Sequence, residues 1–412
     1  MKHHQNHNHS LNKFHSPEGQ HNRRGNIFAL SAVLMVVILG FTAFTVDTGY
    51  ITLTKAQLQN TSDAAALAAL IEIADGYGPG SGLTSSQVLT NAQQAATDVA
   101  AENRAGDVHS VYTDSARDVR LGQYTWNSAT QSWDKLWGVA PYNMVEVTLH
   151  RDQSGSALGD RPLDLFFAPV LGTDQATVSV SSTAVMQPGS GFSTTGSGGG
   201  GGDTEDGECP CGNPQILPIA LDIETWTDLM NGIGSDSYSY NESTGAVTSG
   251  ADGILECSLY PYGNQSLPPG NRGTVDLGSN NNSTADISRQ ILYGLNADDL
   301  SYFGGEITFD ENGELELNGD TGLSAGIKDE LEAIKGQPRA IPIFTAVSGP
   351  GNNANYTIVK FVGIRIMYVK LTGKPADKKV IIQPAPFVDN CVIPGDLPVT
   401  QDSIFAPSSI IN

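Results

Sequence analysis

The sequence predicts an α+β protein: an N-terminal transmembrane helix continuing into a helical segment, a small sheet domain, a Gly-rich linker and a mostly β C-terminal domain. Three observations predict this fold class. An uninterrupted apolar run occupies residues 27–46, a Gly-rich stretch occupies residues 188–208, and strand-like segments dominate the remaining chain. At 412 residues the chain is also long enough for two or three domains, each with its own core.

The apolar run from Ile27 to Val46 contains no charged residue and no proline over 20 residues. A helix of this length rises about 30 Å, the thickness of the hydrocarbon core of a bilayer. Because Arg23 and Arg24 precede the run and Asp47 follows it, the positive-inside rule places the N-terminus in the cytoplasm. A cleaved signal peptide is the alternative, but its apolar region is usually only about 7–15 residues long. We therefore expect a retained single-pass anchor.

The charge of the chain is divided unevenly around this anchor. Residues 1–26 form a polar tail with six of the eight histidines, which we expect to be disordered and cytoplasmic. The whole chain has a net charge of -22, so the part beyond the anchor is strongly acidic. An acidic body repels nucleic acid phosphates, and we exclude nucleic acid as a partner. The sequence also predicts no cofactor.

Residues 47–187 are expected to form an extracytoplasmic α+β domain. The helix continues beyond the anchor, and its predicted packing face consists mostly of small and apolar residues: Leu53, Gln57, Leu58, Ala64, Ala65, Ala68 and Leu70. Thr84 and Gln87 form a predicted capping box for a second helix that runs to about Asn103. Strand-like segments follow: the hairpin VRLGQYTW and WDKLW, then YNMVEVTLHR, LDLFFAPVLG and ATVSVSSTAVM.

Residues 188–208 are dominated by Gly, Ser, Thr and Asp, which predicts a flexible linker. Residues 209–412 are expected to form a mostly β domain. Its predicted strands are ILPIALDI, GILECSLY, EITF, ELEL, AIPIFTAV, YTIVKFVGIRIMYVKL and KVIIQ. The longest of these is apolar on both faces and should be central. Short helices are predicted at 284–293, with Ser283 as N-cap, and at 324–335.

The four cysteines, Cys209, Cys211, Cys257 and Cys391, all follow the anchor, where an extracytoplasmic location permits disulfides. A bridge between Cys209 and Cys211 would be strained, so we expect each of them to pair with Cys257 or Cys391, without a choice between the connectivities. A zinc site is the alternative, but the sequence has no second close cysteine pair and no nearby histidine. We predict no metal site.

Two short patterns resemble metal-binding loops. Asp152, Ser154 and Ser156 spell D-x-S-x-S after a strand, which could begin a magnesium shell if other loops supplied more oxygen ligands. We favour a polar loop, because the alternating helices and strands of a doubly wound domain are missing around it. In DENGELELNGD at 310–320, the carboxylate spacing does not fit a calcium loop. Asn312-Gly313 instead predicts a type I′ turn joining two paired strands.

Enzymatic chemistry has little support in the sequence. Beyond the anchor the only histidines are His109 and His150, and no G-x-S-x-G elbow is present. Many carboxylates could meet after folding, but the sequence selects no pair. We therefore predict that the protein is not an enzyme, with a carboxylate-dependent extracytoplasmic hydrolase as an alternative.

The segment DTGYITLTKAQLQNTSDAAALAAL, directly after an apolar run preceded by RRG, resembles the N-terminal module of the TadE/TadG-like Flp (tight adherence) pilus assembly family. The matching positions are Asp47, Gly49, Leu58, Gln59, Asp63 and the alanine-rich run 64–69. PLDLFFAPVLG and the following Val/Ser/Thr/Ala-rich strand extend the resemblance to about Gln187. Prepilin-type cleavage after Gly25 would want Glu at the fifth mature position, where this chain has Leu30, so the uncleaved TadG-like form is favoured.

This resemblance implies a bacterial inner-membrane protein, with most of its mass outside the cytoplasm, that helps to assemble or anchor a pilus. Its partners would be the membrane, through a single span, and the pilus assembly machinery or other envelope proteins. We expect the motif residues, with Ala65 and Ala68, to pack against a partner helix. A surface-binding protein tethered by a TadG-like module is the alternative. The oligomeric state is left open.

Overall fold

The computed structural model describes residues 24–78, 81–195, 211–261, 272–278, 283–349, 353–374, 377–395 and 397–411. It confirms an α+β protein with a mostly β C-terminal part. The helices are α1 (Arg24–Tyr77), α2 (Ser85–Ala101), α3 (Ser115–Asp118), α4 (Ile223–Met230), α5 (Thr284–Tyr293), α6 (Ala297–Ser301) and α7 (Lys328–Ala333). Two 3-10 helices are η1 (Ala168–Leu171) and η2 (Ala325–Ile327).

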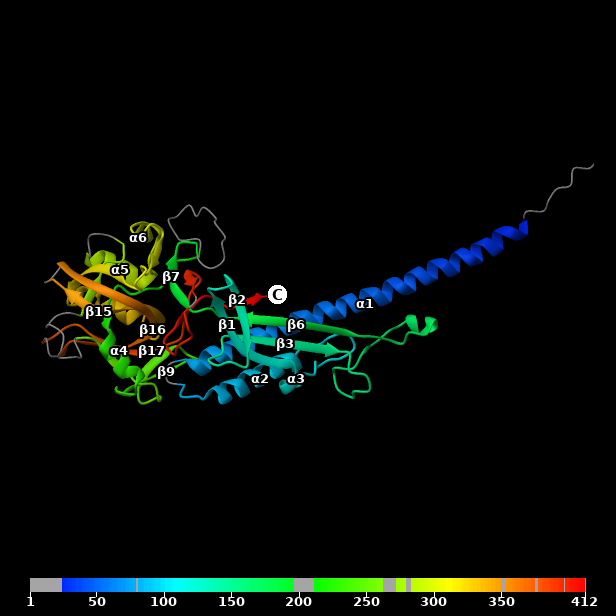
Figure 1. Ribbon diagram of the computed structural model, residues 1–412, viewed down its shortest axis with the longest axis horizontal. Coiled ribbons are helices and arrows are strands. Elements are labelled where there is room, and N and C mark those ends of the chain that lie inside the picture. The colour runs from blue at the N-terminus through cyan, green and yellow to red at the C-terminus, as the bar shows by residue number, and fades with distance from the viewer. Residues whose placement is uncertain are drawn as a thin grey trace, which may run out of the picture.

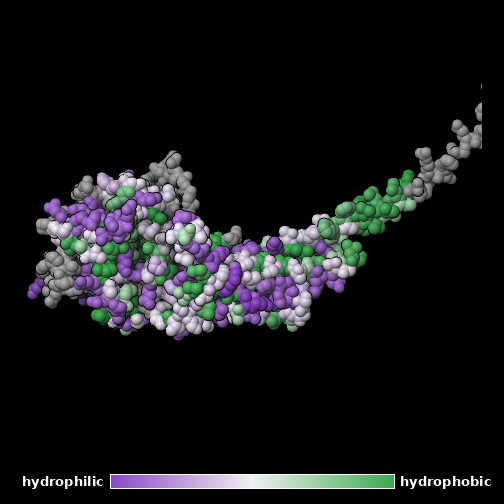
Figure 2. Space-filling view, viewed as in Figure 1, coloured by the Kyte–Doolittle hydropathy of each residue, from purple (hydrophilic) through white to green (hydrophobic). Residues whose placement is uncertain are grey.

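Helix α1 contains both the apolar run and the segment after it, so the predicted continuity is confirmed. It is 54 residues long, and its N-terminal half projects alone from the folded body (Figure 1). The projecting half is covered with hydrophobic side chains (Figure 2); for example, Phe28 is 82% exposed. Among the described residues, α1 is the one helix whose length and hydropathy suit a membrane span.

The N-terminal domain is a five-stranded antiparallel sheet in the order β2-β1-β3-β6-β21. Its strands are β1 (Val119–Asn127), β2 (Ser132–Trp137), β3 (Met144–Arg151), β6 (Val178–Val185) and β21 (Ser409–Ile411). The buried part of α1 lies along β3 and β6, and α2 packs against α1. On β3, Val145, Val147 and Leu149 are buried and alternate with half-buried polar residues, as expected for a sheet covered by helices on one face. The Thr84 capping box is confirmed.

A small two-stranded extension lies at the end of this sheet nearest the projecting helix (Figure 1). It pairs β4 (Leu163–Asp164) with β5 (Gln175–Ala176) and carries η1 between them. The sequence predicts a strand across LDLFFAPVLG, and this is wrong beyond its first two residues, which form β4. Pro169 is at the start of η1 and Gly172, with φ 86°, ends it, so the segment forms a tight turn.

The C-terminal domain is built around a seven-stranded sheet. Strand β16 (Ala354–Lys370) pairs with β14, β15 and β17, which confirms its predicted central position. The other strands are β8 (Leu221–Asp222), β11 (Cys257–Tyr260), β12 (Gly273–Val275), β14 (Leu315–Thr321), β15 (Pro338–Ser348) and β17 (Lys379–Pro384). Helix α5 with its Ser283 cap is confirmed, and the predicted helix at 324–335 is η2 followed by α7.

Smaller sheets complete this domain. Their strands are β7 (Gly189–Ser193), β13 (Glu306–Thr308) and β19 (Val392–Pro394) in one sheet, β9 (Tyr238–Asn241) with β10 (Ala246–Ser249), and β18 (Phe387–Val388) with β20 (Ile404–Phe405). Two buried clusters form the core, one around Trp226 and Ile364, the other around Phe192 and Tyr356.

Three sequence predictions are wrong. Residues 189–193 of the predicted linker form β7, which pairs with β13 and β19, because Phe192 is fully buried in the C-terminal core. ILPIALDI gives only the short β8 before α4 begins, with Asp222 as N-cap. A turn does form at 310–313, but β13 and β14 belong to different sheets, and within the turn Gly313 alone has positive φ. It is therefore not a type I′ hairpin.

Candidate functional site

Asp47, the first motif residue, joins α1 to the η1 turn. Its side chain is buried, and its two carboxylate oxygens accept hydrogen bonds from the backbone N–H groups of Phe166, Phe167 and Ala168, at 2.7–3.3 Å. These are the N–H groups at the start of η1, which have no partners within the helix itself. Tyr50, one turn further along α1, packs on Phe166 with ring centroids 4.9 Å apart. The aspartate therefore fixes the turn against the helix.

Gln59 and Asp63, one turn apart, join the same helix to the sheet. The Gln59 amide donates to Asp63 Oδ1 at 2.9 Å and to Ser182 Oγ at 2.8 Å, and the Ser182 hydroxyl donates to the same Asp63 oxygen. Beside them, the Ser62 hydroxyl donates to the Val147 carbonyl at 2.8 Å. The side chains thus connect α1 to both β6 and β3. Ser182 was not singled out by the sequence, because only the fold brings it to Asp63.

The remaining motif and packing residues lie in different surroundings. Leu58 and Ala65 are fully buried in the N-terminal core, and Ala68 is half-buried. Ala65 is thus covered by the chain's own elements, so it is not available to a partner helix. Gly49 is exposed, and a side chain there would meet no atom within 4 Å. Of the residues expected to meet a partner, Gly49 and Ala64 are exposed.

We expect Asp47→Ala to release the η1 turn from α1. The substitution leaves three backbone N–H groups without their acceptor, so the amides of residues 166–168 should lose protection from hydrogen exchange while those of β3 and β6 keep it. Thr48→Ala is the matched control, because the Thr48 hydroxyl bonds only within α1, to the carbonyls of Phe44 and Thr45. Unchanged exchange at residues 166–168 in Asp47→Ala would contradict this role.

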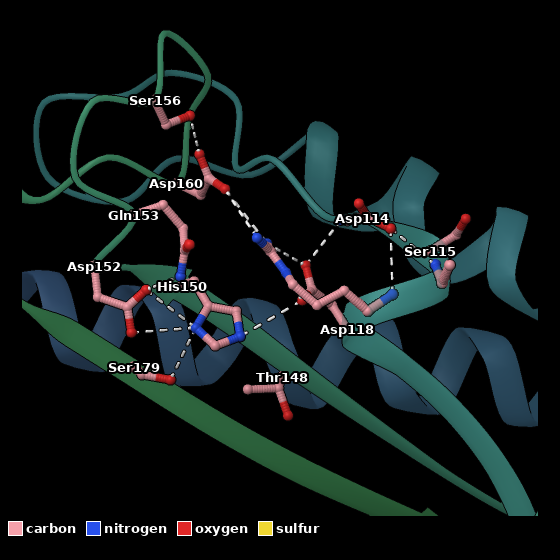
Figure 3. A network of polar contacts seen from close by, with 12 residues as sticks. Asp114, Ser115, Asp118, Thr148, His150, Asp152, Gln153, Ser156, Asp160 and Ser179 are labelled. Carbon is pink, nitrogen blue, oxygen red and sulfur yellow. Dashed lines mark hydrogen bonds and ion pairs between the residues drawn. The ribbon is translucent and has the colours of Figure 1, made fainter.

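Asp152 and Ser156 of the D-x-S-x-S pattern lie in a polar network between β3 and α3 (Figure 3). Asp118 and Asp160 are buried, and Arg117 bonds to both: its Nη2 is 2.8 Å from Asp118 Oδ2 and 3.3 Å from Asp160 Oδ2. Ser156 donates to Asp160 at 2.6 Å, while Asp152 lies beside His150. The pattern residues therefore do not converge on one point. The described residues contain no group of three or more His, Cys, Asp or Glu side chains that could hold a metal ion.

Figure 3 also shows His150 between two carboxylates and a serine, a combination that sequence reasoning missed. Its Nε2 lies 3.5 Å from Asp118 Oδ1, and its Nδ1 lies 3.3 Å from Asp152 and 3.4 Å from Ser179 Oγ. A nucleophilic triad needs one ring nitrogen for the serine and the other for the carboxylate. Here a carboxylate shares the nitrogen nearest Ser179. The arrangement fits a role in holding the loop after β3 against the sheet.

The cysteines confirm one disulfide, between Cys211 and Cys391, which is one of the pairings left open by the sequence. It joins the start of the C-terminal domain to the residue directly before β19, at a sequence separation of 180. Cys257 is a free thiol, so its expected disulfide is wrong; Cys209 lies outside the described residues. Cys257 is on β11 close to the buried Arg272 and Asp222, and burial raises its pKa to about 12.

A cavity of about 490 Å³ opens in the C-terminal domain between β7, β16 and the chain after β19. Its walls are mostly apolar, and they include Phe309, Phe361 and Leu397. Among the described residues of the lining Asp402 is the one carboxylate, and it is already engaged by Lys360 and by Trp226 Nε1 at 2.7 Å. The cavity could bind an apolar group; the part of its wall that the structure describes does not include a pair of carboxylates of the kind used in glycoside hydrolysis.

The bonds to Asp402 make a pH-dependent contribution to stability. Burial alone would raise its pKa, but the ion pair with Lys360 and the Trp226 bond outweigh burial and lower the pKa. This contribution is complete above the ordinary carboxyl pKa and is lost as pH falls through the lowered value. We expect Asp402→Asn to lower the melting temperature at neutral pH, with a difference from wild type that shrinks in acid. Asp329→Asn, at a 91% exposed side chain, is the control and should show little difference at any pH.

Two family models match the chain. "Putative Flp pilus-assembly TadE/G-like" matches residues 25–75, and "Putative Tad-like Flp pilus-assembly" matches residues 54–184. Together they contain α1, the η1 turn and the strands up to β6, including every residue of the Asp47 and Asp63 contacts. No curated protein and no solved structure matches the chain.

Proposed function

Through residues 25–184 this chain belongs to the TadE/TadG-like Flp pilus-assembly family, and from this premise we propose that it is a membrane-anchored, non-catalytic accessory protein for assembling or anchoring a Flp/Tad-type pilus or related surface appendage. Helix α1 crosses the bacterial inner membrane through residues 27–46, with the N-terminus in the cytoplasm. The pilus machinery is the proposed partner.

The observation that carries this proposal is the continuity of α1. One helix contains the exposed apolar segment and, beyond it, the residues that bond to the η1 turn and to β6. A helix joined to a sheet at several points transmits force and orientation, whereas a flexible stalk would not. A scaffold that must hold a pilus base in a fixed direction relative to the membrane needs such a connection.

The experiment uses the tagged full chain in its own cells. Alkaline extraction of membranes tests insertion, and protease accessibility from each side tests orientation. Deleting the gene should reduce the pili sheared from the cell surface, and the full chain should restore them and copurify with pilus assembly subunits. Normal piliation without the gene, together with no recovered pilus subunit, would reject the assembly role even if the anchor is verified.

The cavity beside Asp402 favours a second candidate, a tethered binding protein whose C-terminal domain takes an apolar ligand. Genes for a pilus ATPase and a secretin beside this gene would favour assembly, and their absence would favour the tether. A cavity variant separates the two functions directly. Leu397→Trp, at a 49% exposed position in the lining, should fill the cavity without disturbing the motif contacts of α1. Retained piliation in this variant would assign the pilus role to the N-terminal domain.

A further inference from the structure

The η1 turn carries an apolar tip that the folded chain leaves uncovered. The tip, residues 165–171, has the sequence LFFAPVL. Val170 is 86% exposed and Leu171 is 87% exposed, and Phe166 and Phe167 are also exposed. A cluster of large apolar side chains held together at the end of a turn is unusual for a surface in water, and it marks a site of contact with protein or lipid.

The position of the tip along α1 indicates what contacts it. Val170 and Leu171 line a groove of about 550 Å³ whose opposite wall is α1 from Leu39 to Ile51. Leu39 lies seven residues before Val46, or about 10 Å along the helix axis toward the proposed membrane interior. Figure 2 shows the two apolar surfaces adjoining beside the projecting helix. If α1 spans the bilayer through residues 27–46, the tip lies at the depth of the last turns of the span.

Polar residues beside the tip limit how deeply it can enter the membrane. Asp164, on β4, and Asp174, directly before β5, flank the tip, and the Leu165 N–H donates to the Asp174 carbonyl. Carboxylates are costly to bury in hydrocarbon, so they set the boundary of the apolar part. On α1, Tyr50 packs on Phe166 at the level where aromatic residues gather in membrane proteins.

We propose that the tip inserts into the outer leaflet of the membrane that α1 crosses, with lipid acyl chains covering Phe166, Phe167, Val170 and Leu171. This inference rests on the proposed anchor. The protein then has two membrane contacts, one spanning and one shallow. Because Asp47 holds the tip against α1, the second contact fixes the tilt and rotation of the extracytoplasmic domain relative to the bilayer. Asp47 acts here as a positioning residue.

The test reconstitutes the full chain in vesicles of phosphatidylethanolamine and phosphatidylglycerol, with and without lipid brominated on its acyl chains. Val170→Trp adds an indole at the tip; the native Trp126, Trp133, Trp137 and Trp226 give the background, measured with wild type. We expect bromine to remove most of the added emission, which should be blue-shifted. Val139→Trp is the matched control: this valine is also exposed but follows β2 at the far end of the sheet, and its added emission should be unaffected.

Other outcomes overturn the inference in distinguishable ways. If the protein resists alkaline extraction but neither Val170→Trp nor a second variant, Leu171→Trp, is quenched beyond wild type, the anchor stands and the tip is not in lipid. If photo-crosslinking at position 171 gives dimers in place of quenching, the tip meets a second copy of the chain. If alkali extracts the protein, the proposed anchor fails and this inference fails with it.

Discussion

Replacing Arg272 with methionine is expected to lower the free energy of unfolding of the C-terminal domain by about 3–5 kcal/mol. The Arg272 side chain is 1% exposed, and its Nε lies 2.7 Å from Asp222 Oδ2. It also donates to the Ser258 and Pro261 carbonyls and to Thr225 Oγ1. Without the guanidinium, the buried Asp222 carboxylate at the N-terminus of α4 loses its only described ion-pair partner.

The measurement is urea unfolding of the full chain in detergent, followed by tryptophan fluorescence. Arg120→Met is the matched control, because Arg120 pairs with Glu146 but its side chain is 56% exposed, and its loss should cost at most about 1 kcal/mol. Adding Asp222→Asn to Arg272→Met should recover part of the loss by removing the unpaired charge. Equal effects of Arg272→Met and Arg120→Met would contradict the structural role.

Ala65→Leu is expected to destabilise the N-terminal domain by about 1–3 kcal/mol, the usual cost of overpacking a filled core. Ala65 is fully buried, and its neighbours on the same face of α1, Ala66 and Ala69, are as well. Small side chains here let α1 lie close to the sheet and to α2. A larger side chain must therefore displace α1 from the elements packed against it, and this should strain the Gln59 and Asp63 bonds to Ser182.

Ala64→Leu is the control for this substitution. It makes the same change at the neighbouring position, which is exposed, so its effect on unfolding should be within about 0.5 kcal/mol. Thermal unfolding of both variants tests the difference. The comparison also separates an effect on the fold from an effect on function. A loss of piliation with Ala65→Leu but not with Ala64→Leu would follow from the damaged fold. A loss with Ala64→Leu alone would indicate a partner at the exposed face of α1. Similar stability of the two variants would reject the packing assignment.

Several elements could be predicted because their signals are local. The length of the apolar run, the Thr84 and Ser283 caps, and the apolar residues on both faces of the segment 356–371 are each visible from a few neighbouring residues. The β13 to β14 hairpin and the start of the linker were mispredicted for a common reason. A turn signal or a Gly-rich composition does not reveal which distant strand a segment pairs with, and β7 and β13 pair across more than a hundred residues of sequence.

In the candidate site, too, the sequence indicated individual residues but not their distant partners. The resemblance identified Asp47, Gln59 and Asp63 as notable, but their partners, the η1 backbone and Ser182, are more than a hundred residues away in the sequence. The small-residue face was expected to serve another protein, and Ala65 instead packs inside this chain. Periodicity shows which side of a helix is buried, but it does not show what covers that side.

The C-terminal strand β21 is a further example. It follows the whole C-terminal domain and pairs with β6, so the last residues of the chain complete the N-terminal sheet. Nothing in its short sequence, SII, specifies this partner.

The sequence by itself determined an α+β chain with one long apolar helix, the family resemblance and the main strands, because hydrophobic length and period act over a few turns. The tertiary structure decided that this helix is joined to the η1 turn at Asp47 and to the sheet at Gln59 with Asp63, and that the apolar tip lies beside its last apolar turns. It also decided that the strand after the C-terminal domain returns to the N-terminal sheet. These features depend on burial and hydrogen bonds between residues distant in the chain, which only the packed fold brings together.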